Sequence, residues 1–281
     1  MDLEKRNVRK SNNLVNGKYR FGLIEQKILL SIISKIKISD KEFSPYRISW
    51  SQIKVLTRGK VRTKKGIAAI CEKLKQRTIE VKEGAATNYF GLLSGWKISP
   101  GRWVEFRIDP VMKDMLLDLL EVGNFTLYQL ENILPLSSTY SIRMYEILKS
   151  HEWQGSFEMS LADLRFALDA ENKYKSFSTF RLRVLDKAQK DMKSTDINFT
   201  YKKVTVLREV DSLVFTITKN KTFKSIVQKK DIKTAREGDK VFFNGKSYEV
   251  EGGCIRLPDG PLPIGRVNQL IKKGVITFSS S

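Results

Sequence analysis

The chain contains little of the side-chain chemistry on which metal sites and much of enzyme catalysis depend. Its 281 residues include one histidine, His151, and two cysteines, Cys71 and Cys254. One histidine excludes a site with two histidine ligands, and two cysteines far apart in the sequence are not a metal-binding pair. Two cysteines also form no disulfide framework, which is typical of a reducing cytosol. We therefore expect a cytoplasmic protein without a metal or an organic cofactor.

Long apolar stretches are missing as well. No run approaches the roughly 18 residues needed to span a bilayer, and the polar N-terminus lacks the apolar region of a secretory signal. Gly245-Lys246-Ser247 imitates the end of a phosphate-binding loop, but Lys240 stands where that loop needs glycine. The sequence therefore predicts neither a membrane-spanning segment nor a nucleotide site.

Positive charge, in contrast, is abundant and clustered. The chain has 51 Lys and Arg against 31 Asp and Glu, a net charge of +20 and a pI of about 9.8. Residues 5–20 carry six cations and no acid, residues 57–82 nine against two, and residues 173–193 seven against two. Such clusters favour a polyanion as partner. By charge alone, that partner could be a nucleic acid or an anionic membrane surface.

The last of these clusters has the pattern of a helix with one buried face. Its apolar stripe repeats every four residues and consists of Phe180, Val184, Ala188 and Met192, with Leu185 beside them. Ser178 or Thr179 is expected to cap its start. The face opposite the stripe consists of Thr179, Arg183, Asp186 and Lys190, with Lys187 at its edge. A helix docked by one face and basic on the other suits a DNA major groove, which admits one helix.

An isolated basic helix is equally consistent with a solvated protein surface. The segments that follow favour DNA. Ile197–Tyr201 and Leu213–Ile217 have the pattern of two strands, joined by a charged link at Lys202–Asp211. Helix, basic helix and hairpin is the order of a winged helix, a helix-turn-helix variant with a β wing.

The same order occurs earlier in the chain. Helical spacing from Leu23 to Ile36 is followed by an expected edge strand at Phe43–Ile48 and by a short helix that Ser49 caps. Thr63 caps a second helix, which follows a basic turn and buries Ile67, Ile70, Cys71 and Leu74. Expected strands are Thr78–Val81, Tyr89–Ile98 and Trp103–Ile108, with a turn at Pro100-Gly101.

We interpret the two halves as an internal repeat. The matched positions are Ser49 and Ile53 with Ser160 and Leu164, and Ile67, Leu74 and Ile79 with Leu185, Met192 and Ile197. Gly66, Ala68 and Ala69 in the first basic helix are small enough for close approach of a duplex, and tight helix packing would explain them equally well.

The remaining segments lead to the following expectations. Residues 1–12 fray; Val111–Leu120 and Phe125–Leu134 are helical connectors that Pro135 ends; and a helix runs from Ser138 to about Glu152. In the tail, Val241–Phe243 and Tyr248–Val250 flank Asn244-Gly245, a strong hairpin signal. Ile255–Leu257 is a candidate third strand, Pro258–Pro263 a rigid turn and Val267–Lys272 a last short helix.

Catalytic alternatives have little support. A Mg²⁺ site like those of nucleases could be formed by Asp114, Asp118 and Glu121. Their helical spacing is explained more simply by the solvent-exposed face of a helix. A tyrosine nucleophile such as Tyr140 or Tyr145 has no activating group nearby. We therefore expect a protein that is not an enzyme, with a nuclease or nicking enzyme as the distant rival.

Several motifs together resemble one known family. They are the run Leu136-Ser137-Ser138-Thr139-Tyr140-Ser141-Ile142-Arg143-Met144-Tyr145-Glu146-Ile147-Leu148, then Met159–Arg165, Tyr174-Lys175, Phe177, Phe180-Arg181, Arg183-Val184-Leu185, Ala188 and Thr195-Asp196-Ile197, and near the start Asn13-Leu14-Val15, Leu23 and Glu25-Gln26-Lys27. This pattern resembles the iteron-binding plasmid replication initiators, the initiator Rep family, over about residues 7–219. Members of the family often end the second basic helix with an acidic residue followed by isoleucine. This chain has Asp191-Met192 there, which is a mild departure. The tail after Lys221 lies outside the resemblance.

The resemblance implies tandem winged helices that place their basic helices in successive major grooves of directly repeated origin sites. It also implies a monomer–homodimer equilibrium, in which the dimer forms through the first domain and represses its own promoter while the monomer starts replication. Host initiator and helicase would be recruited in a bacterial cytoplasm, with the protein associated with the plasmid or nucleoid.

We therefore predict an α+β protein with tandem winged-helix domains and a small β-rich C-terminal appendix. The expected parts are residues 1–121 with a flexible basic N-terminus, residues 122–220, and residues 221–281. The predicted function is sequence-specific binding of double-stranded DNA at directly repeated origin sites in plasmid replication initiation. The alternative is a tandem winged-helix transcriptional repressor without a role in initiation.

The predicted DNA-binding residues follow from the two basic helices. In the second domain, Thr179 and Arg183 should contact bases, because arginine is the commonest reader of guanine. Arg181 matches the family motif, although its wheel angle lies near the apolar stripe. Phosphate contacts are expected from Lys175, Lys187 and Lys190. A DNA contact is also expected from Ser178 at the predicted start of the helix. In the first domain, the expected contacts are Lys65, Ala69 and Lys73 on the helix, with Arg58, Lys60, Arg62 and Lys64 in or near the preceding turn.

Overall fold

The structure is a computed structural model of the whole chain. It describes residues 3, 6–37, 39–119, 124–223, 238–243, 246–257, 260–263, 267–268, 270–271 and 277–278. The chain divides into two compact units, Met1–Ile226 and Val227–Ser281. Within the described residues, no helix combines the length and the apolar character needed to cross a membrane.

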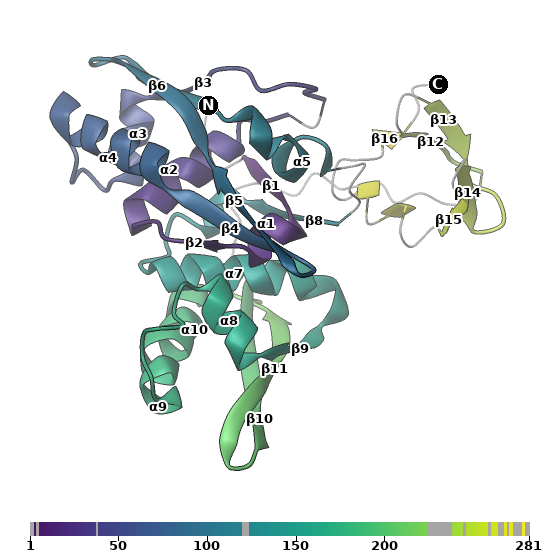
Figure 1. Ribbon diagram of the computed structural model, residues 1–281. Coiled ribbons are helices and arrows are strands. Elements are labelled where there is room, and N and C mark those ends of the chain that lie inside the picture. The colour runs from purple at the N-terminus through teal and green to yellow at the C-terminus, as the bar shows by residue number, and fades with distance from the viewer. Residues whose placement is uncertain are drawn as a thin grey trace. The chain divides into compact units, whose positions relative to one another are not determined.

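The first unit contains two copies of one arrangement of helices and strands (Figure 1). The elements of the first copy are α2 (Leu23–Ile33), β3 (Tyr46–Ser49), α3 (Trp50–Leu56), α4 (Lys64–Gln76), β6 (Leu93–Ser99) and β7 (Trp103–Ile108). Its sheet has the order β3-β7-β6, with antiparallel neighbours. Ser49 caps α3 by accepting a hydrogen bond from the Gln52 amide, and Thr63 caps α4 through the Gly66 amide, as their sequence positions predict.

The second copy repeats this order. Its elements are α7 (Thr139–His151), β9 (Ser156–Ser160), α8 (Leu161–Ala167), α9 (Phe177–Phe180), η5 (Arg181–Leu185), α10 (Asp186–Met192), β10 (Ile197–Val206) and β11 (Glu209–Lys219). The sheet order is β10-β11-β9, which places the last strand in the middle, as in the first copy. Ser160 caps α8 through the Asp163 amide, so Ser49 and Ser160 are structurally equivalent.

The two hairpins differ from their predicted boundaries. The charged segment Lys202–Asp211 is not a link, because β10 and β11 continue through it to a two-residue turn at Leu207 and Arg208. The expected strand Tyr89–Ile98 is two strands, β5 (Ala86–Gly91) and β6, separated at Leu92.

One match in the internal repeat is wrong. Ile79 and Ile197 are both buried near the start of a strand. However, Ile79 lies on β4 (Thr78–Glu83), which pairs with β5 and with β2 (Lys18–Tyr19) in the order β2-β4-β5. The counterpart of β10 in the first copy is β6, since β6 pairs with β7 as β10 pairs with β11. The first copy therefore contains an inserted hairpin between its basic helix and its wing.

The described part of the N-terminal segment is folded into the unit, which contradicts the prediction that residues 1–12 fray. β1 (Asn7–Ser11) pairs antiparallel with β8 (Phe125–Gln129), and α1 (Asn12–Asn16) follows with Ser11 as its cap. The predicted connector at Phe125–Leu134 is thus mainly a strand followed by the short helix η3 (Leu130–Asn132). The other connector contains two short helices, η2 (Pro110–Met112) and α5 (Lys113–Leu116). The secondary structure of β1 and β8 depends on their pairing with each other across more than a hundred residues. The local sequence of either strand does not indicate that pairing.

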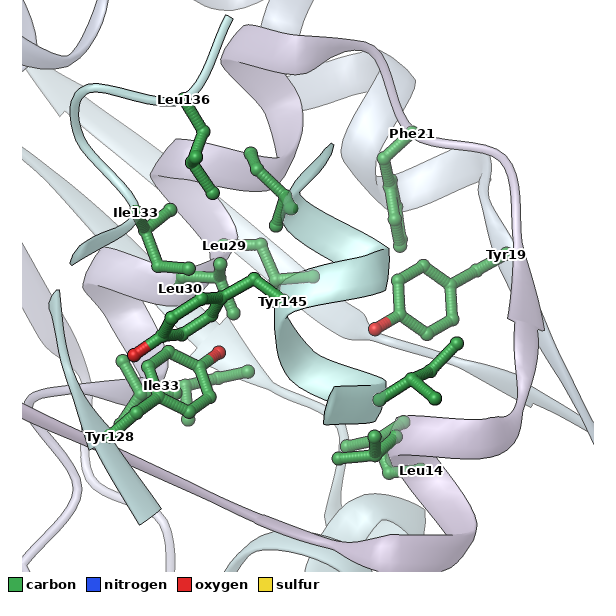
Figure 2. Packing of buried hydrophobic residues seen from close by; sticks show 14 of the residues in the cluster. Leu14, Tyr19, Phe21, Leu29, Leu30, Ile33, Tyr128, Ile133, Leu136 and Tyr145 are labelled. Atoms are coloured by element: carbon green, nitrogen blue, oxygen red, sulfur yellow. The ribbon is translucent and has the colours of Figure 1, made fainter. Parts of the chain in front are cut away.

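The helix α7 forms the centre of this unit. Figure 2 shows Tyr145 on α7 beside Tyr128, with Leu30 and Ile33 of α2 around them, while Tyr19 and Leu14 approach from another side. The rings of Tyr128 and Tyr145 meet edge to face with centroids 5.4 Å apart. Because both copies pack on α7, one hydrophobic core runs through residues of the two winged helices.

The second unit is described only in part. Strands β12 (Lys240–Phe243) and β13 (Lys246–Glu249) pair antiparallel, as predicted; their turn lies outside the described residues. The third strand of this sheet is β16 (Thr277–Phe278), whereas β14 (Cys254–Leu257) pairs with β15 (Gly260–Pro263). The predicted turn at Pro258–Pro263 is therefore wrong for Gly260–Pro263, and Pro258 lies outside the described residues. Val267, Asn268, Leu270 and Ile271 are helical, as predicted.

Candidate nucleic-acid interface

The second basic helix begins earlier than its sequence predicts. Ser176, rather than Ser178 or Thr179, caps it by accepting a hydrogen bond from the Thr179 amide. The Ser176 hydroxyl also lies 3.1 Å from the Ser178 hydroxyl and donates to that of Thr179. The predicted stripe is correct: Phe180, Val184, Leu185, Ala188 and Met192 are buried. The start of the helix is therefore a small cluster of hydroxyl groups at the protein surface.

A π-helical turn at Arg181–Leu185 changes which residues this helix exposes. Arg181, Leu182 and Arg183 are exposed in succession, although a uniform helical wheel places Arg181 near the apolar stripe. A π-turn holds more residues per turn than an α-helix and thereby rotates its side chains out of the regular phase. Arg181 forms an ion pair of 3.7 Å with Asp186. Among the described residues, Arg183 has no hydrogen-bond or ion-pair partner.

The remaining predicted residues of this helix fall into two groups. Lys175 and Lys190 are exposed. Lys187 is only partly exposed and is already bound, since its ammonium group donates to the Asp191 carboxylate at 2.9 Å and to the Ser137 hydroxyl at 2.6 Å. Burial raises the pKa of Asp191, but hydrogen bonds from Lys187 and Ser137 outweigh it and lower the pKa overall. Lys187 thus fastens the helix to the segment before α7.

The loop before the helix is held by an arginine that the sequence did not single out for this role. The Arg165 guanidinium donates to the carbonyl oxygens of Ala170, Lys173 and Tyr174 at 2.8–3.2 Å. It also lies over the Phe180 ring at 4.6 Å. These contacts fix the loop that carries Lys175, so that the loop and the helix present one surface.

The first basic helix exposes the residues predicted from its spacing. Lys65, Ala69 and Lys73 are exposed on α4, and Ile67, Cys71 and Leu74 are buried. A Cβ atom on Gly66 would lie 2.9 Å from Val61 Cγ1. Close packing against the preceding turn therefore explains this glycine.

The turn before α4 exposes Arg58, Lys60 and Arg62, and Lys64 is exposed at the first position of α4. Two of these side chains bind backbone. Arg58, at a φ of 49°, donates to the Pro135 carbonyl at 3.1 Å, and Arg62 donates to the Gly59 carbonyl at 2.9 Å. Arg58 therefore links the turn of the first copy to the segment that leads into the second.

A buried ionic network joins the two copies. Glu146 on α7 accepts hydrogen bonds from Lys10 at 2.7 Å, from Arg143 at 2.8 Å and from the Tyr128 hydroxyl at 2.5 Å. Arg143 also donates to the Tyr19 hydroxyl and to the carbonyl oxygens of Val15 and Gly17. The N-terminal segment is thus attached to the first helix of the second copy.

In this network, burial and the neighbouring charges shift each pKa in opposite directions, and the balance differs between Lys10 and Glu146. Burial lowers the pKa of Lys10 to about 8, although Glu146 raises it. For Glu146 burial raises the pKa, but Lys10 and Arg143 more than compensate and lower it to about 2. The contact favours the charged form of both groups, but burial prevails over it at Lys10 and the cations prevail over burial at Glu146. Both groups are ionised at pH 7. We conclude that the network specifies position more than it adds stability, as is common for buried ion pairs.

Further ion pairs connect the copies nearer the surface. Arg20 binds Asp169 at 2.8 Å and Lys18 binds Glu171 at 2.6 Å. The sequence signal for the buried network is the Arg143 and Glu146 pair, three residues apart on a helix whose apolar residues include Ile142, Ile147 and Leu148. Its partner Lys10 gave no signal, because it lies in a segment that looks polar and basic throughout.

A capped short helix, a basic helix and a three-stranded sheet with a long hairpin occur twice in one compact unit, which defines a tandem winged-helix protein. The chain belongs to the initiator replication protein family: the family models of its two winged-helix domains, WH1 and WH2, match residues 7–149 and 160–217.

Two relatives illustrate the similarity. A replication initiation protein of Escherichia coli is 24% identical over 194 residues, which cover 62% of this chain and 56% of the relative. The chain thus spans about half the length of this curated relative. The crystal structure of Pi initiator protein in complex with iteron DNA matches with a TM-score of 0.63 and 18% identity, covering 78% of this chain and 99% of that chain. At this identity, the similarity establishes the fold.

Proposed function

We propose that this protein binds double-stranded DNA at directly repeated origin sites of a plasmid and initiates its replication. The observation that supports this most is the pair of exposed basic helices, α4 and α9–α10, each on a winged-helix fold within one compact unit. Two such helices fit successive major grooves, since each groove admits one helix. The structurally similar Pi initiator protein was crystallised in complex with iteron DNA, which is consistent with DNA binding by these two helices.

The second basic helix supplies the base contacts. Arg183 reads guanine, since its guanidinium is exposed and without a partner among the described residues. Thr179 and Arg181 lie on the same exposed surface. Lys175, Lys190 and Ser178 contact phosphates, which position the protein without specifying sequence. Lys187 contributes least, because Asp191 and Ser137 already hold it.

The first basic helix occupies the neighbouring groove. Lys65, Ala69 and Lys73 face the bases or the phosphates there, with Lys64 at the start of α4 and Lys60 in the preceding turn. Arg58 and Arg62 act mainly by shaping this turn, because both donate to backbone carbonyls.

We keep three functional parts, residues 1–121 and 122–220 for the two winged helices and residues 221–281 for the appendix. The pairing of β1 with β8 crosses the first of these boundaries. A monomer–homodimer equilibrium, repression of its own promoter and recruitment of a host initiator and helicase belong to this proposal. Origin opening then follows from DNA bending and from recruited proteins, and this chain needs no catalytic group of its own.

DNase footprinting on several hundred base pairs flanking the gene, at physiological salt, tests the proposal. The expected result is evenly phased protection of direct repeats, each about two helical turns long. Protection confined to one inverted repeat at the promoter would instead indicate the tandem winged-helix repressor. Absence of any protection, together with strand cleavage that depends on a divalent metal, would indicate a nuclease.

A further inference from the structure

One apolar side chain stands within the basic face of the second helix. Leu182 is 59% exposed and lies between Arg181 and Arg183, which are exposed as well. Exposed leucines are common on protein surfaces, so the exposure alone assigns no role. The position does, because this is the surface that faces DNA in the proposed function.

Leu182 lies in the π-helical turn Arg181–Leu185. Val184 and Leu185, which follow directly, are fully buried against the rest of the second winged helix. Leu182 is therefore held on a rigid element rather than on a mobile loop. The two flanking arginines differ in availability, since Arg181 pairs with Asp186 at 3.7 Å and Arg183 is without a partner among the described residues.

We propose that Leu182 reads a thymine by packing on its C5 methyl group in the major groove. The thymine methyl is the apolar group that a base pair presents there, and it distinguishes thymine from cytosine. Leu182 then contributes sequence information beside Arg183, which reads guanine. This inference rests on the proposed function and adds to it a residue that recognises one particular base.

The surroundings favour this occupant over a protein partner. A protein-docking surface needs a contiguous apolar patch, and the other large exposed hydrophobic residues of the described chain belong to other elements. Leu182 is instead preceded and followed in the chain by an exposed arginine. A single apolar side chain within a cationic face is complementary to a thymine methyl group near the DNA phosphates.

The experiment removes one methyl group at a time from the DNA. The full chain first enriches its preferred duplex from a random-sequence duplex pool. Each thymine of that duplex is then replaced singly by deoxyuridine, which retains base pairing and lacks the methyl group. At one thymine, binding of the unchanged protein should weaken about fourfold, which corresponds to ~0.8 kcal/mol for one buried methyl group.

The decisive comparison uses Leu182→Ala, which suits an exposed helical position because alanine is a strong helix former. This variant should bind the thymine and uracil duplexes equally at that position. Leu182→Met should retain most of the discrimination, because methionine keeps an apolar side chain of similar size. The matched control is Leu207→Ala, which also removes an exposed leucine, at the tip of the β10–β11 hairpin, and should leave the fourfold discrimination unchanged.

Two kinds of failure can be distinguished. Enrichment of no duplex would overturn the proposed function and this inference together. An enriched duplex that tolerates uracil at every thymine, or a uracil penalty that persists in Leu182→Ala, would overturn the inference alone and leave DNA binding in place.

Discussion

Replacing Glu146 by glutamine removes a carboxylate that two buried cations share. Lys10 and Arg143 lie 2.7 and 2.8 Å from its oxygens, and the side chains of all three residues are at most 3% exposed. Glutamine can still accept hydrogen bonds but carries no charge. Removing one partner of a buried ion pair costs about 3–5 kcal/mol, because the other charges remain desolvated. Total stabilities are only about 5–15 kcal/mol, so the expected loss is large.

Tryptophan fluorescence during thermal or urea unfolding at pH 7 measures this loss in the relevant part of the chain. All four tryptophans, Trp50, Trp96, Trp103 and Trp153, lie in the first compact unit. For a unit of this size, 1 kcal/mol shifts Tm by about 2–4 °C, so Glu146→Gln should lower Tm by roughly 6–20 °C.

The matched control is Glu152→Gln, which breaks a pair of similar geometry near the surface. Glu152 binds Lys149 at 2.6 Å, but its side chain is 32% exposed, and its loss should cost no more than about 1 kcal/mol. Adding Lys10→Met to Glu146→Gln should recover part of the stability, since one fewer cation is then buried without its partner. Equal small losses in the two single variants would refute the role of the buried network.

Four further predictions follow from the same contacts. Burial raises the pKa of Glu146, but Lys10 and Arg143 more than compensate and lower it from 4.5 to about 2 in the folded protein. Ionised Glu146 is therefore stabilising relative to its protonated form, fully so above pH 4.5; this difference is lost as the pH falls toward 2, and acid titrations of Glu146→Gln should lack it. Arg183→Ala should weaken binding to the enriched duplex by about 1–3 kcal/mol and to random DNA very little; equal losses on both would assign it to phosphate or structure. Specific binding should fall by about 0.9 log unit per log unit of salt for each phosphate contact, and a flat response would contradict the polyanion partner. Leu207 and Arg208 both have positive φ, so Leu207→Asn with Arg208→Gly should raise the unfolding free energy by about 1 kcal/mol, and unchanged urea midpoints would argue against strain in this turn.

Local signals in the sequence were sufficient for the elements that carry the interface. Ser49, Thr63 and Ser160 cap the predicted helices, because a capping side chain bonds to amides only two or three residues ahead. The four-residue spacing of Phe180, Val184 and Ala188 identified the buried side of the second basic helix, since helix periodicity is also a local property.

Phase errors arose where the local pattern departs from a regular helix. The exposed position of Arg181 depends on a π-helical turn, and a wheel drawn at a constant angle has no means of including one. Leu182 is exposed as well, and it was not among the predicted DNA-binding residues because those were chosen mainly for positive charge.

By itself, the sequence determined the two basic helices, the cap of the first, their buried stripes and the basic character of the exposed faces, because these depend on residues within a few positions of one another. Only the tertiary structure decided that Lys10 lies beside Glu146, that β1 pairs with β8, and that the β4–β5 hairpin is inserted before the first wing. Those contacts join segments more than a hundred residues apart or choose between equally suitable strands. Local propensity contains no information about which distant segments pair. These pairings are selected by the free energy gained when one shared core is buried around α7.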